Sequence, residues 1–331
     1  MRLPGFTYYK PSTPAKVCSL LSKYQGEARP LAGGTALLVD LGQRLVTPKY
    51  IISLSGLRML DYIKEDEKGW LRIGACTTID SLCNSALVKA KYPVLVQAAG
   101  LIGVPSIRLR GTVGGNISLD TRCIYYNQSE FWWQSRIACF KRAGNICHAV
   151  KGSKRCNSVC QSDLAPVLLA LDARVKLQSG RGERNISISG FFTGQGEKPN
   201  ILSSEQIITE IQIPPLSKNS VGAYHKRTIR RAIDFPLASV AAVLDINRDK
   251  VCHNIKLVLG AIAPAPVEIN MAETILKGKS LNDELIEEAA EAAFKAAHPV
   301  GNLSIDAGYR RKMIRIFTKR AIKQALNQGY S

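Results

Sequence analysis

Five cysteines stand close together in one irregular, aromatic-rich stretch of the sequence: Cys123, Cys139, Cys147, Cys156 and Cys160. Thiolates bind zinc and iron–sulfur clusters, and a segment without helical or strand periodicity gives these thiols no obvious place in a core. Zinc sites usually take C-x2–4-C pairs, and only Cys156 and Cys160 approach that spacing. The wider spacing of the other thiols favours an iron–sulfur cluster, with zinc as the alternative.

Two glycine turns indicate a second kind of ligand. The first is Ala32-Gly-Gly-Thr-Ala36 and the second is Gly111-Thr-Val-Gly-Gly-Asn116. A Gly-Gly pair leaves backbone N–H groups uncovered for a phosphate, and a following helix adds its positive N-terminal end. One such turn is ordinary structural punctuation, but two predict a long diphosphate ligand. The Rossmann G-x-G-x-x-G pattern and the complete P-loop are both missing from the sequence.

The elements that must position these residues alternate between helix and strand, which predicts a mixed α and β fold. Ser12 or Thr13 can cap the first helix, and Asn282 can cap a later one. Pro214-Pro215 and the polar residues after it are a plausible linker. We expect helices at 11–24, 79–89, 94–102, 282–297 and 304–326, and strands at 50–54, 70–74, 174–178, 206–213, 221–227, 238–247 and 251–263.

Composition and charge limit the function classes. The 331 residues are 46% hydrophobic with a formal charge of +19, which suits a folded protein with an anionic partner. We find neither a secretory signal nor an apolar stretch long enough to span a membrane, so we expect a cytoplasmic protein with reduced thiols. Basic residues surround the cysteines and fill 309–323. The second run is typical of a solvated helix face, and no nucleic-acid-binding signature accompanies either.

Four motifs together resemble the FAD-binding medium subunit of the molybdenum hydroxylase family, which includes xanthine and carbon monoxide dehydrogenases. They are Ala32–Leu38, Gly111–Ile117, Ser162-Asp-Leu-Ala-Pro166 and the stretch from Tyr224 to Asp234, in the family's order over nearly the whole chain. Most members lack a cysteine-rich insertion. The stretch from Asp120 to Cys156 is similar to the β subunit of 4-hydroxybenzoyl-CoA reductase, in which an inserted loop carries a [4Fe–4S] cluster.

The resemblance implies a set of site residues. Residues 32–36 would wrap the FAD diphosphate, the second turn would approach the ribityl and phosphate region, Asp163 would bind a ribose or adenine-side hydroxyl, and Lys226 would lie near the isoalloxazine. A surface lysine is the alternative for Lys226. The implied cofactor residues are Ala32, Gly33, Gly34, Thr35, Ala36, Leu37, Thr112, Gly114, Gly115, Asn116, Asp163 and Lys226, and the implied cluster ligands are Cys123, Cys139, Cys147 and Cys156. Cys160 has no role in this pattern.

The implied fold is α+β. An FAD-binding domain of two subdomains (1–215, split near 55) would carry the insertion at 120–160, and a smaller α/β domain would follow at 216–331. The implied function is an oxidoreductase subunit that relays electrons between ferredoxin, cluster, FAD and the [2Fe–2S] and molybdenum subunits, in a dimer of heterotrimers. Substrate would bind on another chain, so the resemblance implies no catalytic residue on this one. The alternatives are a flavin subunit of an oxidative hydroxylase acting on an N-heterocycle, purine or aldehyde, and a zinc-stabilised nucleic-acid-binding protein.

Overall fold

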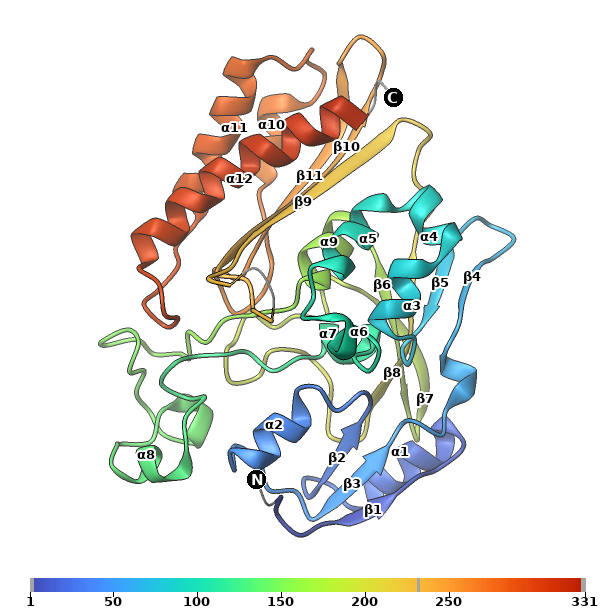
Figure 1. Ribbon diagram of the computed structural model, residues 1–331, viewed down its shortest axis with the longest axis vertical. Coiled ribbons are helices and arrows are strands. Elements are labelled where there is room, and N and C mark those ends of the chain that lie inside the picture. Colours follow the sequence, from blue (N-terminus) through green and yellow to red (C-terminus); the bar gives the residue numbers. More distant parts are fainter. Residues whose placement is uncertain (1–2, 231–232, 329–331) are drawn as a thin grey trace.

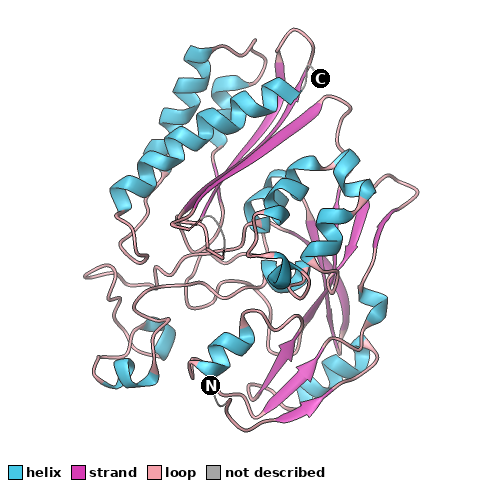
Figure 2. Cartoon of the chain, viewed as in Figure 1, coloured by secondary structure: helices cyan, strands magenta, loops and turns pink. Residues whose placement is uncertain are grey.

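The computed structural model describes residues 3–230 and 233–328, which form three sheets with helices packed against them (Figure 1). The predicted α+β class is confirmed. Helices and strands alternate along the chain, and long irregular segments join the sheets (Figure 2). Within the described range, no helix is both long and apolar enough to cross a membrane.

The first sheet has three parallel strands in the order β1-β3-β2. Helix α1 (Pro14–Lys23) packs on it through a buried face that includes Val17 and Leu21. Its predicted cap is confirmed at Thr13, whose hydroxyl accepts a hydrogen bond from the backbone N–H of Lys16 at 3.3 Å. The strands are β1 (Thr7–Tyr9), β2 (Ala28–Leu31) and β3 (Tyr50–Ser53), and the short helix α2 (Leu37–Gly42) follows β2.

The second sheet is antiparallel, in the order β4-β5-β8-β6-β7. Helices between β5 and β6 build the largest core with it. The expected helix at 79–89 is divided in two, because Ser85 is extended and its hydroxyl caps the second part. The strands are β4 (Ile63–Glu65), β5 (Leu71–Gly74), β6 (Arg174–Ser179), β7 (Gly182–Ser187) and β8 (Ile207–Ile213). The helices are α3 (Ile79–Asn84), α4 (Ala86–Lys91), α5 (Pro93–Gly100), α6 (Pro105–Arg108), α7 (Val113–Ile117) and α9 (Leu164–Ala170).

The third sheet is also antiparallel, in the order β12-β11-β10-β9. Three helices cover one face of it, and α5 and α9 pack against the sheet as well (Figure 1). The predicted Asn282 cap is confirmed by a 2.9 Å hydrogen bond from the N–H of Leu285. The strands are β9 (Ser220–Arg227), β10 (Ala238–Ile246), β11 (Cys252–Gly260) and β12 (Val267–Glu268), and the helices are α10 (Asn270–Leu276), α11 (Asp283–Ala296) and α12 (Ala307–Gln328).

The basic run in α12 is only partly a solvated face. Arg315 and Lys319 pair with Glu287 of α11 at the surface, as a solvated face predicts. Arg310, however, is completely buried. The prediction was wrong there because Arg310 lies one helical turn before Ile314, on the side that packs against the sheet.

The cysteine-rich insertion projects from the body of the molecule, on the same side as α2 (Figure 1). It is largely irregular, as predicted, apart from α8 (Glu130–Gln134) and one 3₁₀ turn at Phe140–Arg142. The N-terminus of α8 is capped by Ser129, whose hydroxyl accepts from the N–H of Trp132 at 3.4 Å. Trp133 packs inside the insertion and donates from Nε1 to the carbonyl of Tyr126 at 3.0 Å.

Candidate functional site

The two glycine turns lie against each other, although they are far apart in the sequence. A Cβ atom at Gly33 would stand 1.7 Å from the carbonyl oxygen of Arg110, so only glycine fits there. Gly34 has a φ of +78°, which lets the chain turn from β2 into α2. The fold therefore uses both glycines of the first turn to bring that turn against the second.

The first turn leaves its backbone donors unused. Among the described residues, the N–H groups of Ala32 through Leu37 donate no hydrogen bond, and the next N–H, that of Leu38, donates to the Gly34 carbonyl at 3.1 Å. All these residues are half-exposed, so a ligand can reach them. Successive free N–H groups in a turn are the arrangement that binds phosphate oxygens.

The second turn uses its donors internally. The N–H groups of Val113 and Gly114 donate to the carbonyls of Thr77 and Ala75, each at 2.9 Å. The N–H of Gly115 donates to the Thr112 hydroxyl at 3.1 Å, and that of Asn116 donates to the Thr112 carbonyl at 2.9 Å. The expectation that this Gly-Gly pair offers free N–H groups to a phosphate was therefore wrong.

Asn116 connects the second turn to the segment that carries Asp163. Its Oδ1 accepts hydrogen bonds from the Ser162 hydroxyl at 2.6 Å and from the N–H of Leu164 at 3.4 Å. The structure thus brings together the second turn and the start of α9. Both had been named from the sequence as parts of one site.

Asp163 lies in a buried polar network with two residues of β9. One carboxylate oxygen accepts from the Tyr224 hydroxyl at 2.7 Å, and the other pairs with Lys226 Nζ at 2.9 Å. The side chains of Asp163 and Lys226 are each only 5% exposed, so the alternative of a surface lysine was wrong. Burial raises the pKa of Asp163, and the charge of Lys226 opposes that shift.

Lys226 also fixes two loops beside this network. Its ammonium donates to the carbonyls of Leu101 at 2.8 Å and Asp234 at 3.2 Å. Sequence reasoning placed Tyr224 in one of the four motifs but gave it no role in the site, although strand alternation puts it on the same face as Lys226. That period-two signal could have identified it.

Large apolar side chains near these residues are exposed. Leu38 follows the first turn, Leu109 precedes the Arg110 carbonyl that contacts Gly33, and Leu101 holds Lys226. Leu109 is 57% exposed. A cofactor with an extended ring system would cover such groups, because covering apolar surface is favourable in water.

The insertion begins and ends in a short two-stranded segment, which we call the stem (residues 121–124 and 156–160). Arg122 and Val159 exchange two backbone hydrogen bonds of 2.9 Å. Beside them, the Thr121 hydroxyl donates at 2.6 Å and that of Ser158 at 3.1 Å to the carbonyl of Gly196. The stem therefore holds Cys123 and Cys156 on neighbouring strands.

Three of the four proposed ligand thiols affect one another electrostatically. The pKa of Cys123 is raised to about 11, chiefly by burial, and the nearby Cys156 and Cys147 contribute to this rise. Burial also raises the pKa of Cys147, but hydrogen bonds from Asn157 Nδ2 (3.4 Å) and nearby backbone N–H groups hold it below its usual value. Cys139 lies at the 3₁₀ turn, where it pairs with Ile146.

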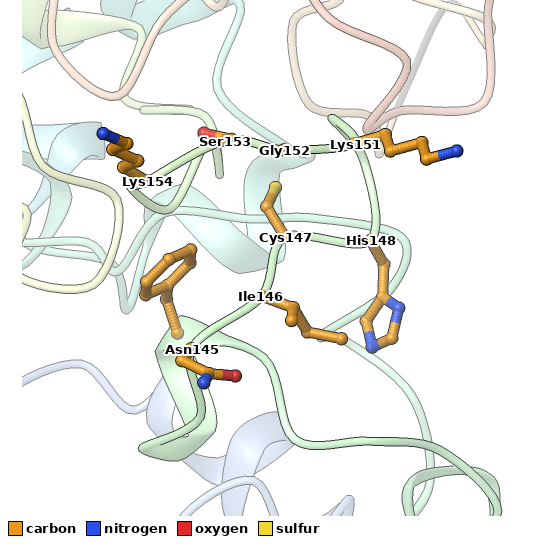
Figure 3. Close-up of a pocket in the computed structure, with 9 residues that line it drawn as sticks. Asn145, Ile146, Cys147, His148, Lys151, Gly152, Ser153 and Lys154 are labelled. Carbon is orange, nitrogen blue, oxygen red and sulfur yellow. The ribbon is translucent and has the colours of Figure 1, made fainter.

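The thiols do not form a closed ligand set. In the described ranges, no group of three or more Cys, His, Asp or Glu side chains is placed to hold a metal ion. The Cys147 side chain borders a cavity of about 750 Å³ and points toward the Gly152–Ser153 segment, while the His148 ring points away (Figure 3). Cys160 is buried, and burial raises the pKa of its thiol to about 11.

A cluster of charges lies between the stem and α2. Lys141 is buried and donates to Asp120 at 2.6 Å and to the Thr121 hydroxyl at 2.8 Å. Asp40 of α2 has a buried Oδ1 without a hydrogen-bond partner in the described part of the chain. Burial raises the pKa of Asp40. The charge of Asp120 raises it as well, whereas the charges of Arg122 and Lys141 lower it. The helix after the first glycine turn is therefore close to the cysteine insertion.

The chain is similar to known redox proteins over nearly its full length. A family model described as the FAD binding domain in molybdopterin dehydrogenase matches residues 4–216, and one for the CO dehydrogenase flavoprotein C-terminal domain matches 223–325. The glyceraldehyde dehydrogenase medium chain of Sulfolobus acidocaldarius is 27% identical, covering 97% of this chain and 98% of the relative. The xanthine dehydrogenase FAD-binding subunit of Escherichia coli O157:H7 is 27% identical, with coverages of 97% and 96%.

A solved structure agrees with these matches. Carbon monoxide dehydrogenase from Hydrogenophaga pseudoflava superimposes with a TM-score of 0.82 at 27% identity, covering 99% of each chain. The whole fold, and not one domain alone, is thus shared with this relative.

Proposed function

Because the chain belongs to the family of FAD-binding medium subunits of molybdenum hydroxylases, we propose that it is an electron-transfer subunit that binds FAD and a [4Fe–4S] cluster. Membership makes it the flavoprotein subunit of an oxidoreductase complex. The proposal adds the cluster and a role like that of the β subunit of 4-hydroxybenzoyl-CoA reductase. The observation that carries this addition is the cysteine insertion at 120–160.

For FAD, the residues present fit the cofactor. The free N–H groups from Ala32 to Leu37 would hold the diphosphate, with Ala36 contributing only its main chain. Gly114, Gly115 and Asn116, preceded by Thr112, would approach the ribityl region by close packing, since their N–H groups are already bonded. Asp163 has acceptor capacity left for a ribose hydroxyl, and Lys226 would lie toward the flavin ring. FAD supplies a carrier that can exchange one or two electrons.

For the cluster, the chemistry of the donor groups fits, because four cysteine thiolates are the usual ligands of a [4Fe–4S] cluster. Cys123, Cys139, Cys147 and Cys156 would be the ligands, and N–H groups already donate to the Cys147 sulfur, as expected around a cluster thiolate. The charge of Lys141 lowers the pKa of Cys156, although burial raises it overall. The proposal requires the loop between the stem strands to close around the cluster, because the thiols are not yet in a ligating arrangement.

The partners follow from the family and from surface charge. We propose a molybdenum-cofactor large subunit and a [2Fe–2S] small subunit, in a cytoplasmic dimer of heterotrimers. An acidic ferredoxin-type carrier would be the electron donor. Its docking is supported by exposed Arg136, Lys151, Lys154 and Arg155 on the insertion, where Glu130 is the one acidic residue between 121 and 160. We also propose the division into residues 1–215 and 216–331, supported by the Pro214-Pro215 linker before β9.

A second candidate is the flavin subunit of an oxidative hydroxylase, with electrons leaving through FAD. It is favoured by the names of the relatives, which include glyceraldehyde, carbon monoxide and xanthine dehydrogenases. The purified complex decides between the two: reduction of its flavin by an aldehyde, purine or N-heterocycle supports this candidate. Reduction by a low-potential ferredoxin, dependent on the cysteine insertion, supports the first. A zinc-stabilised nucleic-acid-binding protein has no support in either family match.

The proposal is tested by iron, sulfide and flavin analysis of protein purified without oxygen. We expect about four iron and four sulfide per FAD, the content of one [4Fe–4S] centre. Cys139→Ala should lose the iron and keep FAD, because it removes one proposed cluster ligand and none of the free N–H groups of residues 32–37. Cys160→Ala is the matched control and should keep both. FAD without iron in the unmodified protein would reject the cluster, and zinc without flavin would reject the whole proposal.

A further inference from the structure

Arg310 is a buried cation with no acidic partner. It lies at the start of α12, is 0% exposed, and forms no ion pair among the described residues. Burial lowers its pKa to about 10, so the guanidinium is still charged at neutral pH. A buried charge is tolerated only when hydrogen bonds replace its lost hydration. The acceptors of Arg310 therefore show which segments of the chain the residue holds together.

The guanidinium donates to backbone and side-chain oxygens from three separate loops. They are the carbonyls of Leu237 (2.9 Å), Ala261 (2.7 Å) and Val300 (2.7 Å), and Oδ1 of Asn302 (3.3 Å). The planar fork of arginine can reach several acceptors at fixed angles, which a lysine ammonium cannot do as well. Arg310 thus fixes the positions of these loops relative to one another.

Asn302 connects the loops bound by Arg310 to the stem. Its backbone carbonyl accepts a hydrogen bond from the N–H of Ile124 at 3.0 Å, and its side-chain Nδ2 donates to the carbonyl of Asn157. Ile124 follows Cys123, and Asn157 follows Cys156. One fully buried asparagine therefore contacts both strands of the stem, each time next to a proposed cluster ligand.

The other loops held by Arg310 contact the stem and its continuation as well. The N–H of Cys160 donates to the carbonyl of Ala263 at 3.0 Å, two residues beyond Ala261. The side chain of Gln161 donates to the carbonyl of Pro236 at 3.1 Å, next to Leu237. Each loop bound by Arg310 thus has a direct contact with 121–124 or 157–161.

We propose that Arg310 is a positioning residue for the cysteine insertion and that it acts through Asn302. The third sheet and its helices then have a role beyond their own packing, because they hold the stem that carries Cys123 and Cys156. The consequence for iron loading rests on the proposed cluster. The positioning itself does not, since it concerns only hydrogen bonds present in the chain.

Two variants and one control test this in the full-length protein. Arg310→Lys removes the fork, and Asn302→Ala removes only the contact to Asn157 and one acceptor of Arg310. Arg311→Lys is the control, since Arg311 donates to the carbonyl of Phe294 within the same domain and contacts neither stem strand. Amide hydrogen exchange is measured on peptides covering the stem, together with iron per FAD.

We expect exchange in 121–124 and 157–160 to rise about tenfold or more in Arg310→Lys and Asn302→Ala, because local opening exposes these amides. Iron per FAD should fall in both, while Arg311→Lys changes neither. Exchange that rises in β10 and β11 but not in the stem would overturn the inference. If Arg310→Lys does not fold, Asn302→Ala decides alone. Faster stem exchange in a protein that never held iron would support the positioning role and contradict the cluster.

Discussion

The two glycine turns have similar compositions but use their backbone donors differently. In the described part of the chain, the N–H groups of residues 32–37 have no hydrogen-bond partner, whereas those from Val113 to Asn116 donate within the protein. The glycines differ accordingly. Gly33 and Gly34 allow a close contact and a left-handed turn, and Gly114 lets α7 approach Ala75.

This difference gives the two turns different roles: the first can bind a ligand phosphate, and the second supports the first. A ligand phosphate can take the free donors of the first turn, while the second turn supplies the Arg110 carbonyl region against which the first turn rests. Two similar Gly-Gly motifs therefore need not bind the same part of a ligand. The hydrogen-bond partners distinguish them, and sequence composition does not.

The largest expected effect is that of Gly33→Ala. The added Cβ would stand 1.7 Å from the carbonyl oxygen of Arg110. Because this oxygen belongs to the backbone, a side-chain rotation cannot relieve the clash, and one of the two turns must shift. We expect loss of FAD binding and a lower free energy of unfolding by about 3 kcal/mol. Flavin content and denaturant unfolding would measure both. Normal FAD affinity in this variant would contradict the role of the first turn in binding FAD.

Gly114→Ala should affect stability more than binding. Its Cβ would lie 2.8 Å from the Ala75 Cβ and 2.9 Å from the Ala75 carbonyl, which is overpacking inside the second turn. We expect a loss of about 2 kcal/mol in the free energy of unfolding. At a temperature where the variant is folded, FAD titration should show a much smaller affinity loss than Gly33→Ala shows. An equal or greater affinity loss would mean that the second turn contributes as much to FAD binding as the first, against the distinction drawn here.

Thr112→Ala should have the smallest effect of the three. It removes the hydroxyl that caps α7 through the N–H of Gly115, at a cost of about 1 kcal/mol. It also frees that N–H, so the second turn becomes more like the first. Thermal unfolding and FAD titration measure the two effects. We expect a lower melting temperature with unchanged FAD affinity, and tighter FAD binding would contradict the supporting role of the second turn.

Much of this fold could be predicted from local patterns. Thr13 and Asn282 cap helices as their residue types and positions indicated, and strands β9, β10 and β11 of the third sheet were located to within a few residues. Among the elements missed were β7, which is mostly exposed polar residues, the two-residue strand β12, and α10, which is a single short amphipathic segment. These failures are local and have local causes.

The candidate site was harder to predict, because its key features depend on contacts between distant residues. The Gly33–Arg110 contact and the pairing of Asp163 with β9 join residues far apart in the sequence, so local composition does not show them. Arg310 is different. Its spacing to Ile314, Phe317 and Ala321 repeats the buried face of α12, so helical periodicity could have marked it as internal.

Amide hydrogen exchange of residues 32–37, compared between apoprotein and FAD-loaded protein, most directly tests whether this chain holds its flavin at the first glycine turn. We predict that FAD slows exchange there by about tenfold or more, because free N–H groups gain phosphate acceptors. The amides of residues 113–116 should change much less, since they are already hydrogen-bonded. Unchanged exchange at 32–37 in a protein that has bound FAD would contradict the account.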